Sequence, residues 1–71
     1  MTSLTNIKRK AESITGARAS IEYDEYTGAY VEVSSEKDIS LDKLDSVCSE
    51  TGALMKIGEP NHFGENRYLF R

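Results

Sequence analysis

The sequence has few of the residues on which secreted or catalytic small proteins depend. Its 71 residues include one cysteine, one histidine and one proline, and no tryptophan. The lone Cys48 cannot close an internal disulfide, whereas small secreted domains usually carry several. The chain also lacks the run of about eighteen apolar residues that spans a membrane, and it begins without the apolar segment of a signal peptide. These absences predict a cytoplasmic protein with no membrane contact.

Candidate catalytic and metal-binding groups are equally sparse. His62 is the one obvious base, and it lies in a loop, where a histidine is usually a solvated turn residue. Cys48 falls beside the apolar side of an expected helix, where free cysteine mostly behaves as a small buried hydrophobe. Together they do not supply the three or four ligands of a zinc site. We expect no enzyme activity, no metal and no cofactor.

The charge balance is slightly acidic. Nine lysines and arginines face twelve aspartates and glutamates, which gives a net charge of −3. Proteins that bind the phosphate backbone of nucleic acids usually show a basic excess. This balance counts against general nucleic-acid binding, although it leaves room for a local basic patch.

The first half of the chain predicts a helix followed by a hairpin. Apolar residues recur every three or four positions over residues 4–14, and Thr2 or Ser3 can cap the start of this helix. From residue 17 the apolar period changes to two, which is typical of a half-buried strand. The inward positions are Ala17, Ala19, Ile21 and Tyr23, and, after the turn "DEYTG", Ala29, Val31 and Val33.

The second half repeats this plan. Ser40 is a good N-cap, with Ile39 and Leu44 placed to pack against each other across it. The expected buried stripe of the helix is Leu41, Leu44, Val47 and Cys48, and the next strand alternates Ala53, Met55 and Ile57 with Leu54 and Lys56. In the last strand, strict repetition would turn Leu69 inward, whereas one additional loop residue would turn Tyr68 and Phe70 inward. We favour the second arrangement because it buries two aromatic rings.

The two halves also echo each other in sequence, "SITGARASI" at residues 13–21 and "SETGALMKI" at residues 49–57. We interpret residues 1–71 as a single α+β domain of two αββ repeats, about 3–34 and about 40–71. Neither repeat has enough apolar surface to fold alone. Joined, they would form a four-stranded antiparallel sheet with both helices on one face. This topology resembles a circularly permuted ferredoxin-like sandwich, which implies a fold and no particular function.

The sheet face opposite the helices is the leading candidate for a binding site. The alternation places Tyr30, Leu54 and Leu69 there with Lys56, and an apolar patch with a charged rim is typical of a protein contact. Two simpler explanations compete with a binding site. These residues could be scattered surface apolar residues, or the register could be shifted by one, which would turn them inward. The sequence therefore favours a small non-catalytic protein-binding module, a regulator, adaptor or inhibitor, whose partner is another protein or a second copy.

Nucleic-acid binding is the alternative function. Lys8, Arg9 and Lys10 cluster on the first helix, and Arg18 follows it, so phosphates could pair there while bases stack on the sheet. A solvated helix face explains the same residues more simply. Small acidic domains of this kind are common among accessory proteins of phages and mobile elements, but that association rests on no residue.

Overall fold

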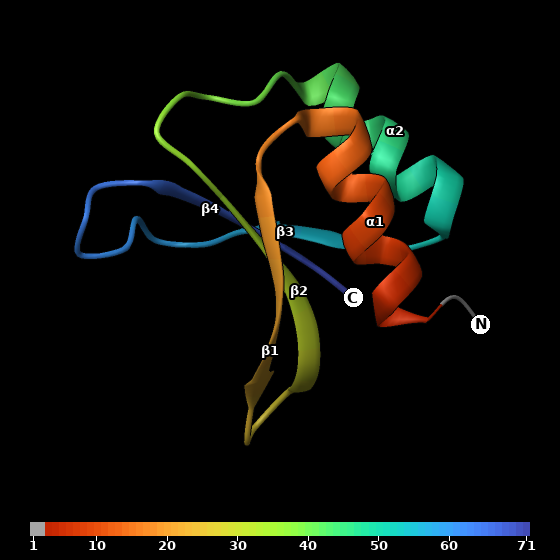
Figure 1. The fold of residues 1–71 in the computed structure, drawn as a ribbon. Coiled ribbons are helices and arrows are strands. Elements are labelled where there is room, and N and C mark those ends of the chain that lie inside the picture. The colour runs from red at the N-terminus through yellow and green to blue at the C-terminus, as the bar shows by residue number, and fades with distance from the viewer. Residues whose placement is uncertain (1–2) are drawn as a thin grey trace.

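The computed structural model describes residues 3–71, and these residues form two helices and one four-stranded sheet. The elements follow in the order α1 (Leu4–Thr15), β1 (Arg18–Asp24), β2 (Gly28–Ser35), α2 (Leu41–Thr51), β3 (Met55–Ile57) and β4 (Asn66–Phe70). The sheet is antiparallel and open, with the strand order β1-β2-β4-β3. The two helices lie next to each other on one side of it (Figure 1). The α+β class predicted from the sequence is confirmed.

Both helices begin at a serine that caps the first turn. The Oγ atom of Ser3 accepts a hydrogen bond from the backbone N–H of Asn6 at 3.2 Å, and that of Ser40 accepts one from Lys43 at 3.4 Å. Each contact satisfies one of the N–H groups that a helix start leaves without an intrahelical partner. Ser3 therefore fills the predicted cap of α1, while Thr2 lies outside the described residues.

The turn from each helix into the following strand is held by a threonine. Thr51 Oγ1 donates to the carbonyl of Val47 at 2.6 Å and accepts from the N–H of Ala53 at 3.2 Å. Thr15 makes the corresponding two contacts at the same distances. The glycine after each threonine has a φ of 72° or 74°, a left-handed conformation that costs glycine little because it has no Cβ.

The core lies between the helices and the sheet, and the last strand contributes its aromatic residues to it. Val31 is paired with Phe70 and Val33 with Tyr68, and all four side chains are buried. The hydroxyl of Tyr68 accepts a hydrogen bond from the N–H of Ile39 at 3.3 Å, which gives the polar end of the ring a partner. The prediction that Tyr68 and Phe70 face inward is confirmed. The other buried apolar residues are Ile7, Ala11, Ala19, Leu44, Val47 and Ala53.

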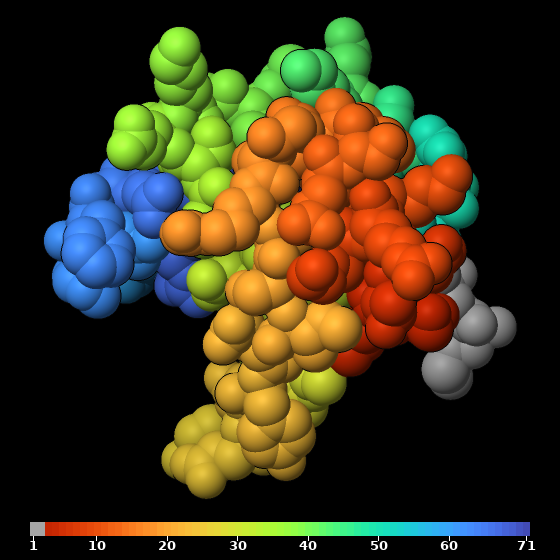
Figure 2. Space-filling view, in the orientation of Figure 1, coloured from red at the N-terminus to blue at the C-terminus, as the bar shows by residue number. Residues whose placement is uncertain are grey.

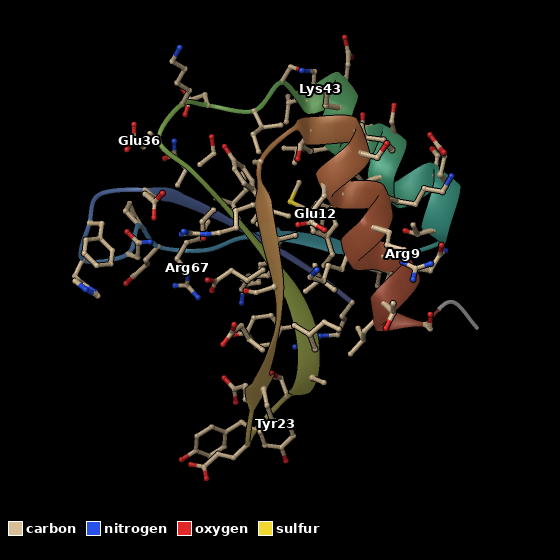
Figure 3. All side chains as sticks on the ribbon, viewed as in Figure 1. Arg9, Glu12, Tyr23, Glu36, Lys43 and Arg67 are labelled. Atoms are coloured by element: carbon tan, nitrogen blue, oxygen red, sulfur yellow. The ribbon has the colours of Figure 1, made fainter. Side chains whose placement is uncertain are left out.

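The predicted burial of Ile21 and Tyr23 is wrong. Their side chains are 45% and 75% exposed, and Ala29, which was also expected to face inward and lies opposite Tyr23, is exposed as well. The reason is that the β1–β2 hairpin extends past the rest of the described residues: β4 pairs with β2 only between Val31 and Ser35, so β4 does not reach the hairpin tip. Figure 3 shows Tyr23 near this tip, well away from both helices. These two positions are on the helix side of the sheet, but neither α1 nor α2 covers them.

Two more predicted core positions, Leu41 and Ile57, are also exposed, by 67% and 63%. Leu41 is the first residue of α2, and Ile39, just before the helix, packs against the core instead. Ile57 ends the short strand β3 at the edge of the sheet, where only Met55 of that strand packs against the core. The core is therefore centred on β2 and β4. None of the helices formed by residues 3–71 combines the length and apolar character needed to cross a bilayer.

Candidate protein-binding face

The side of the sheet away from the helices, which we call the open face, has no layer covering it among the described residues. The strand registers align its side chains in rows. In one row Glu32 on β2 lies opposite Ser20 on β1 and opposite Leu69 on β4, and Leu69 in turn lies opposite Lys56 on β3. Figure 3 shows Arg67 projecting on this side, away from α1 and α2.

A pocket with a volume of about 340 Å³ opens where the β1–β2 hairpin approaches the ends of β3 and β4. Leu54 and Arg71 hold one side of it together, because their backbones exchange two hydrogen bonds of 2.9 and 3.0 Å beyond the assigned ends of the strands. This volume is at the lower end of the range typical of binding pockets. The lining residues are Thr27, Tyr30, Leu54, Met55, Lys56, Leu69, Phe70 and Arg71.

All four residues predicted from the sequence to bind protein line this pocket. They are Tyr30, Leu54, Lys56 and Leu69. Tyr30 and Leu69 are half-buried at its walls, whereas Leu54 and Lys56 are exposed, Leu54 by 78%. Tyr30, Leu54 and Leu69, which come from three different segments, thus place apolar surface around one pocket. A large exposed aliphatic side chain next to an aromatic wall is the kind of surface that a partner's apolar side chain can cover.

The charged side chains that line the pocket are both basic. Lys56 and Arg71 are both exposed at its rim, and the lining residues include no aspartate or glutamate. A bound group that brings a negative charge next to an apolar side chain would therefore find a cation for the charge and Leu54, Tyr30 and Leu69 for the apolar part. Charge complementarity of this kind contributes to partner choice and to the rate of association.

Sequence reasoning missed half of the lining residues. Arg71 had a usable signal, since continuing the alternation by two from Leu69 places it on the open face. Thr27 had none, because it belongs to the turn whose position depends on how far the hairpin extends. Met55 and Phe70 belong to the core side of their strands, so alternation alone does not predict that they also line the pocket.

An ion pair lies beside the pocket on the open face. Arg67 Nη2 is 2.8 Å from Glu32 Oε1, and its Nε donates to the same oxygen at 2.9 Å. Both side chains are mostly covered, with 25% and 20% exposure. The hydrogen bond to Glu32 raises the pKa of the Arg67 guanidinium, an effect that partial burial opposes. The pair neutralises the central charges of the face, which leaves Lys56 and Arg71 as the cations at the pocket.

The basic residues nominated for nucleic-acid binding are not brought together. Lys8, Arg9 and Lys10 belong to α1 on the covered side of the sheet, whereas Arg18 lies on the open face, next to the buried Ala19. Three of the four have carboxylate partners: the pairs are Lys8–Glu12 at 3.3 Å, Lys10–Glu50 at 3.2 Å and Arg18–Glu65 at 3.4 Å. Arg9 points away from the sheet (Figure 3). The arrangement offers no continuous basic surface through these residues.

The two groups weighed for chemistry lie in separate surroundings. The His62 ring stacks on its neighbour Phe63, with ring centroids 4.1 Å apart, in the exposed loop between β3 and β4. Cys48 is half-buried on α2, and desolvation, followed by the nearby charge of Asp45, raises the pKa of its thiol. Residues 3–71 contain no group of three His, Cys, Asp or Glu side chains that could hold a metal ion.

Comparisons of this chain with protein-family models, with curated proteins and with solved structures found no match. The function is therefore inferred from the geometry alone.

Proposed function

We propose that this chain is a small non-catalytic protein-binding module that uses its open face to take a segment of another protein. The observation that carries the proposal is the pocket itself, because Tyr30, Leu54 and Leu69 converge there from separate segments with two cationic side chains and no aspartate or glutamate at the lining. We expect the bound segment to carry an aromatic or aliphatic side chain beside aspartate or glutamate. Through such a contact the module acts as a regulator, adaptor or inhibitor.

Removal of apolar surface from water supports binding at this site. Covering an exposed leucine on binding contributes about 1.5–3 kcal/mol when the burial is complete. Leu54 is 78% exposed, so most of this free energy becomes available only when a partner covers it. The tyrosine wall adds a rigid ring with a polar tip, which is common among residues that dominate protein interfaces.

The proposal can be tested by selecting displayed peptides on the immobilised protein. Enriched peptides should place Asp or Glu next to an apolar residue, and they should not bind Leu54→Lys, whose circular dichroism should match that of the wild type. The double variant Lys56→Glu/Arg71→Glu should reverse the charge preference toward basic peptides. Enrichment that persists on Leu54→Lys, or shows no charge preference, would contradict this site.

The finer architecture is also a proposal. We infer that the two αββ halves descend from one duplicated unit arranged in a permuted ferredoxin-like topology. What supports this is that Thr15 and Thr51 make the same pair of contacts at the same distances, each followed by a left-handed glycine. The two halves then differ at outward positions, where Arg18 of the first corresponds to Leu54 of the second.

Nucleic-acid binding stays the alternative prediction. It requires Lys8, Arg9, Lys10 and Arg18 to reach one ligand, although three of them have carboxylate partners. Fluorescence anisotropy with a labelled single-stranded oligonucleotide at low and moderate salt tests it, since phosphate contacts weaken steeply with salt. Binding that is lost on neutralising these four residues would establish the alternative.

A further inference from the structure

Strand β1 forms one edge of the sheet, and its outer side is open. It pairs with β2 along its whole length, from Arg18 opposite Ser34 to Asp24 opposite Gly28. Among residues 3–71, no other segment makes backbone hydrogen bonds to it. Figure 2 shows β1 running uncovered down the middle of the molecule from α1 toward the hairpin tip. The strand can therefore accept another strand alongside it.

The ladders determine which backbone groups point outward. In an antiparallel sheet, pairs that exchange both hydrogen bonds alternate with pairs that exchange none. Leu54 and Arg71 exchange both, at 2.9 and 3.0 Å. The same alternation then makes Val31–Phe70 a hydrogen-bonded pair between β2 and β4, and Ser20–Glu32 one between β1 and β2. On β1 the residues on either side of Ser20 therefore point the other way. The free N–H and C=O groups of Ala19, Ile21 and Tyr23 point to the open edge.

This edge has few of the features that usually prevent strands from associating. Proteins protect exposed edges with very short strands, lysines, prolines or bulges. The other edge follows the rule, because β3 has 3 residues and carries Lys56. In contrast, β1 has 7 residues, contains no proline or lysine, and pairs with β2 without a bulge, and its charged residues Arg18, Glu22 and Asp24 all lie on the open face. Ile21 and Tyr23 additionally expose apolar surface along it.

We propose that β1 pairs with β1 of a second copy of this chain, antiparallel, about a twofold axis at Ile21. In this register Ile21 lies opposite Ile21 of the second copy, and Ala19 lies opposite its Tyr23. These are the positions whose free backbone groups point outward, so the hydrogen bonds can form. The exposed apolar side chains of both copies then cover each other on the helix side of the sheet.

Charge complementarity on the open face supports the same register. It sets Arg18 opposite Asp24 of the second copy and Ser20 opposite its Glu22, so each end of the paired strands joins opposite charges. A register shifted toward the hairpin tip would instead set Glu22 against Glu22. A shift in the other direction would leave Tyr23 outside the paired strands. The twofold register thus uses every residue of β1 without opposing like charges.

The dimer has a geometric consequence for binding. The twofold axis is perpendicular to the sheet, so the two open faces lie on the same side of one continuous sheet. Each hairpin, which supplies Thr27 and Tyr30 to its pocket, is held along its outer edge by the other copy. This consequence rests on the proposed function, whereas the strand pairing does not. If the pockets bind protein segments, the dimer presents two of them to one partner, which raises its effective affinity.

A cysteine placed on the axis tests the register directly. Paired residues that exchange hydrogen bonds have Cα atoms about 5.5 Å apart, within the range of about 4.4–6.8 Å that a disulfide spans. In a Cys48→Ala background, Ile21→Cys should therefore form a covalent dimer under mild oxidation. Ser20→Cys is the matched control, because its side chain is on the opposite face and is offset from Ser20 of the second copy. Equal cross-linking of both variants, or none of either, would overturn the proposal.

Sedimentation gives an independent readout. Wild-type protein should show a concentration-dependent dimer, and Ile21→Lys, which opposes two like charges at the axis, should raise the dimer dissociation constant about tenfold or more with an unchanged circular dichroism spectrum. Leu54→Lys should leave the dimer intact and lose only peptide binding, so failure of one proposal is distinguishable from failure of the other. A wild-type chain that is monomeric at millimolar concentration, or a dimer disrupted by Leu54→Lys alone, would contradict pairing through β1.

Discussion

Arg67 on β4 and Glu32 on β2 form a double contact through one carboxylate oxygen, with nitrogen–oxygen distances of 2.8 and 2.9 Å. The two strands come from opposite halves of the chain, and their pairing is the contact that makes one sheet out of two hairpins. The ion pair therefore fastens the centre of the open face. It also fixes the surface next to Leu69, which lies directly opposite Glu32.

Replacing Glu32 by glutamine should lower the free energy of unfolding by about 1 kcal/mol, because it leaves a mostly covered guanidinium without its counter-charge. Urea denaturation measures this change. Glu50→Gln is the matched control: it breaks the Lys10 pair, whose side chains are 44% and 48% exposed, and should cost no more than about 0.5 kcal/mol. If both variants lost the same free energy of unfolding, the partial burial of the Arg67–Glu32 pair would add nothing to stability.

The threonine that ends α2 should matter more than the one that ends α1. Thr51 is 4% exposed, whereas Thr15 is only half-buried, although both make the same contacts. Thr51→Val should lower the free energy of unfolding by about 1–2 kcal/mol, since the buried N–H of Ala53 loses its partner. Thr15→Val should cost less because water can reach the freed group. Thermal or urea unfolding of both variants decides the order, and a larger loss for Thr15→Val would contradict it.

Truncating the last strand tests which of its faces is in the core. Phe70 is fully buried, so Phe70→Ala should destabilise the fold by about 3–5 kcal/mol, close to the whole stability expected for a domain of this size. Leu54→Ala removes a side chain that is 78% exposed and should change stability by less than about 0.5 kcal/mol. Circular dichroism and urea unfolding compare the two. A stable Phe70→Ala protein would be inconsistent with the observed register of β4.

The thiol of Cys48 should react slowly in the folded protein. Burial raises its pKa, so less thiolate, the reactive form, is present near neutral pH. Because the folded state holds this proton more tightly than the unfolded chain, the free energy of unfolding should fall as the pH rises above the ordinary thiol pKa. The free energy of unfolding of Cys48→Ala should fall less over the same alkaline range, because the thiol that titrates is gone. Thiol labelling with and without urea, and unfolding of both proteins across alkaline pH, measure the two effects. Folded-state labelling as fast as in urea would contradict the first.

Local sequence signals predicted the elements and much of the core. Ser40 and the two glycines marked the helix boundaries, and the period of two placed Val31, Val33, Tyr68 and Phe70 inward. These signals are local because caps and alternation depend on neighbouring residues. They do not report how far an element extends past its neighbours.

The wrong core predictions lie where the length of an element, here the β1–β2 hairpin, decides whether its side chains are buried. Ile21 and Tyr23 follow the inward alternation, yet the hairpin that carries them extends beyond the helices and beyond β4, so they are exposed. For the same reason the sequence did not reveal that β1 offers a long open edge. The pocket was partly predictable: Tyr30, Leu54, Lys56 and Leu69 came from alternation, whereas Thr27 depended on the extent of the hairpin.

Binding of a protein segment at the pocket of the open face is tested most directly by a titration followed by nuclear magnetic resonance. A peptide enriched by display, with an apolar residue next to Asp or Glu, is added to isotope-labelled protein. We expect the largest amide shifts at Thr27, Tyr30, Leu54 and Leu69, and we expect Leu54→Lys to abolish them. Shifts centred on α1 or on the β1 edge, with the pocket amides unmoved, would contradict it.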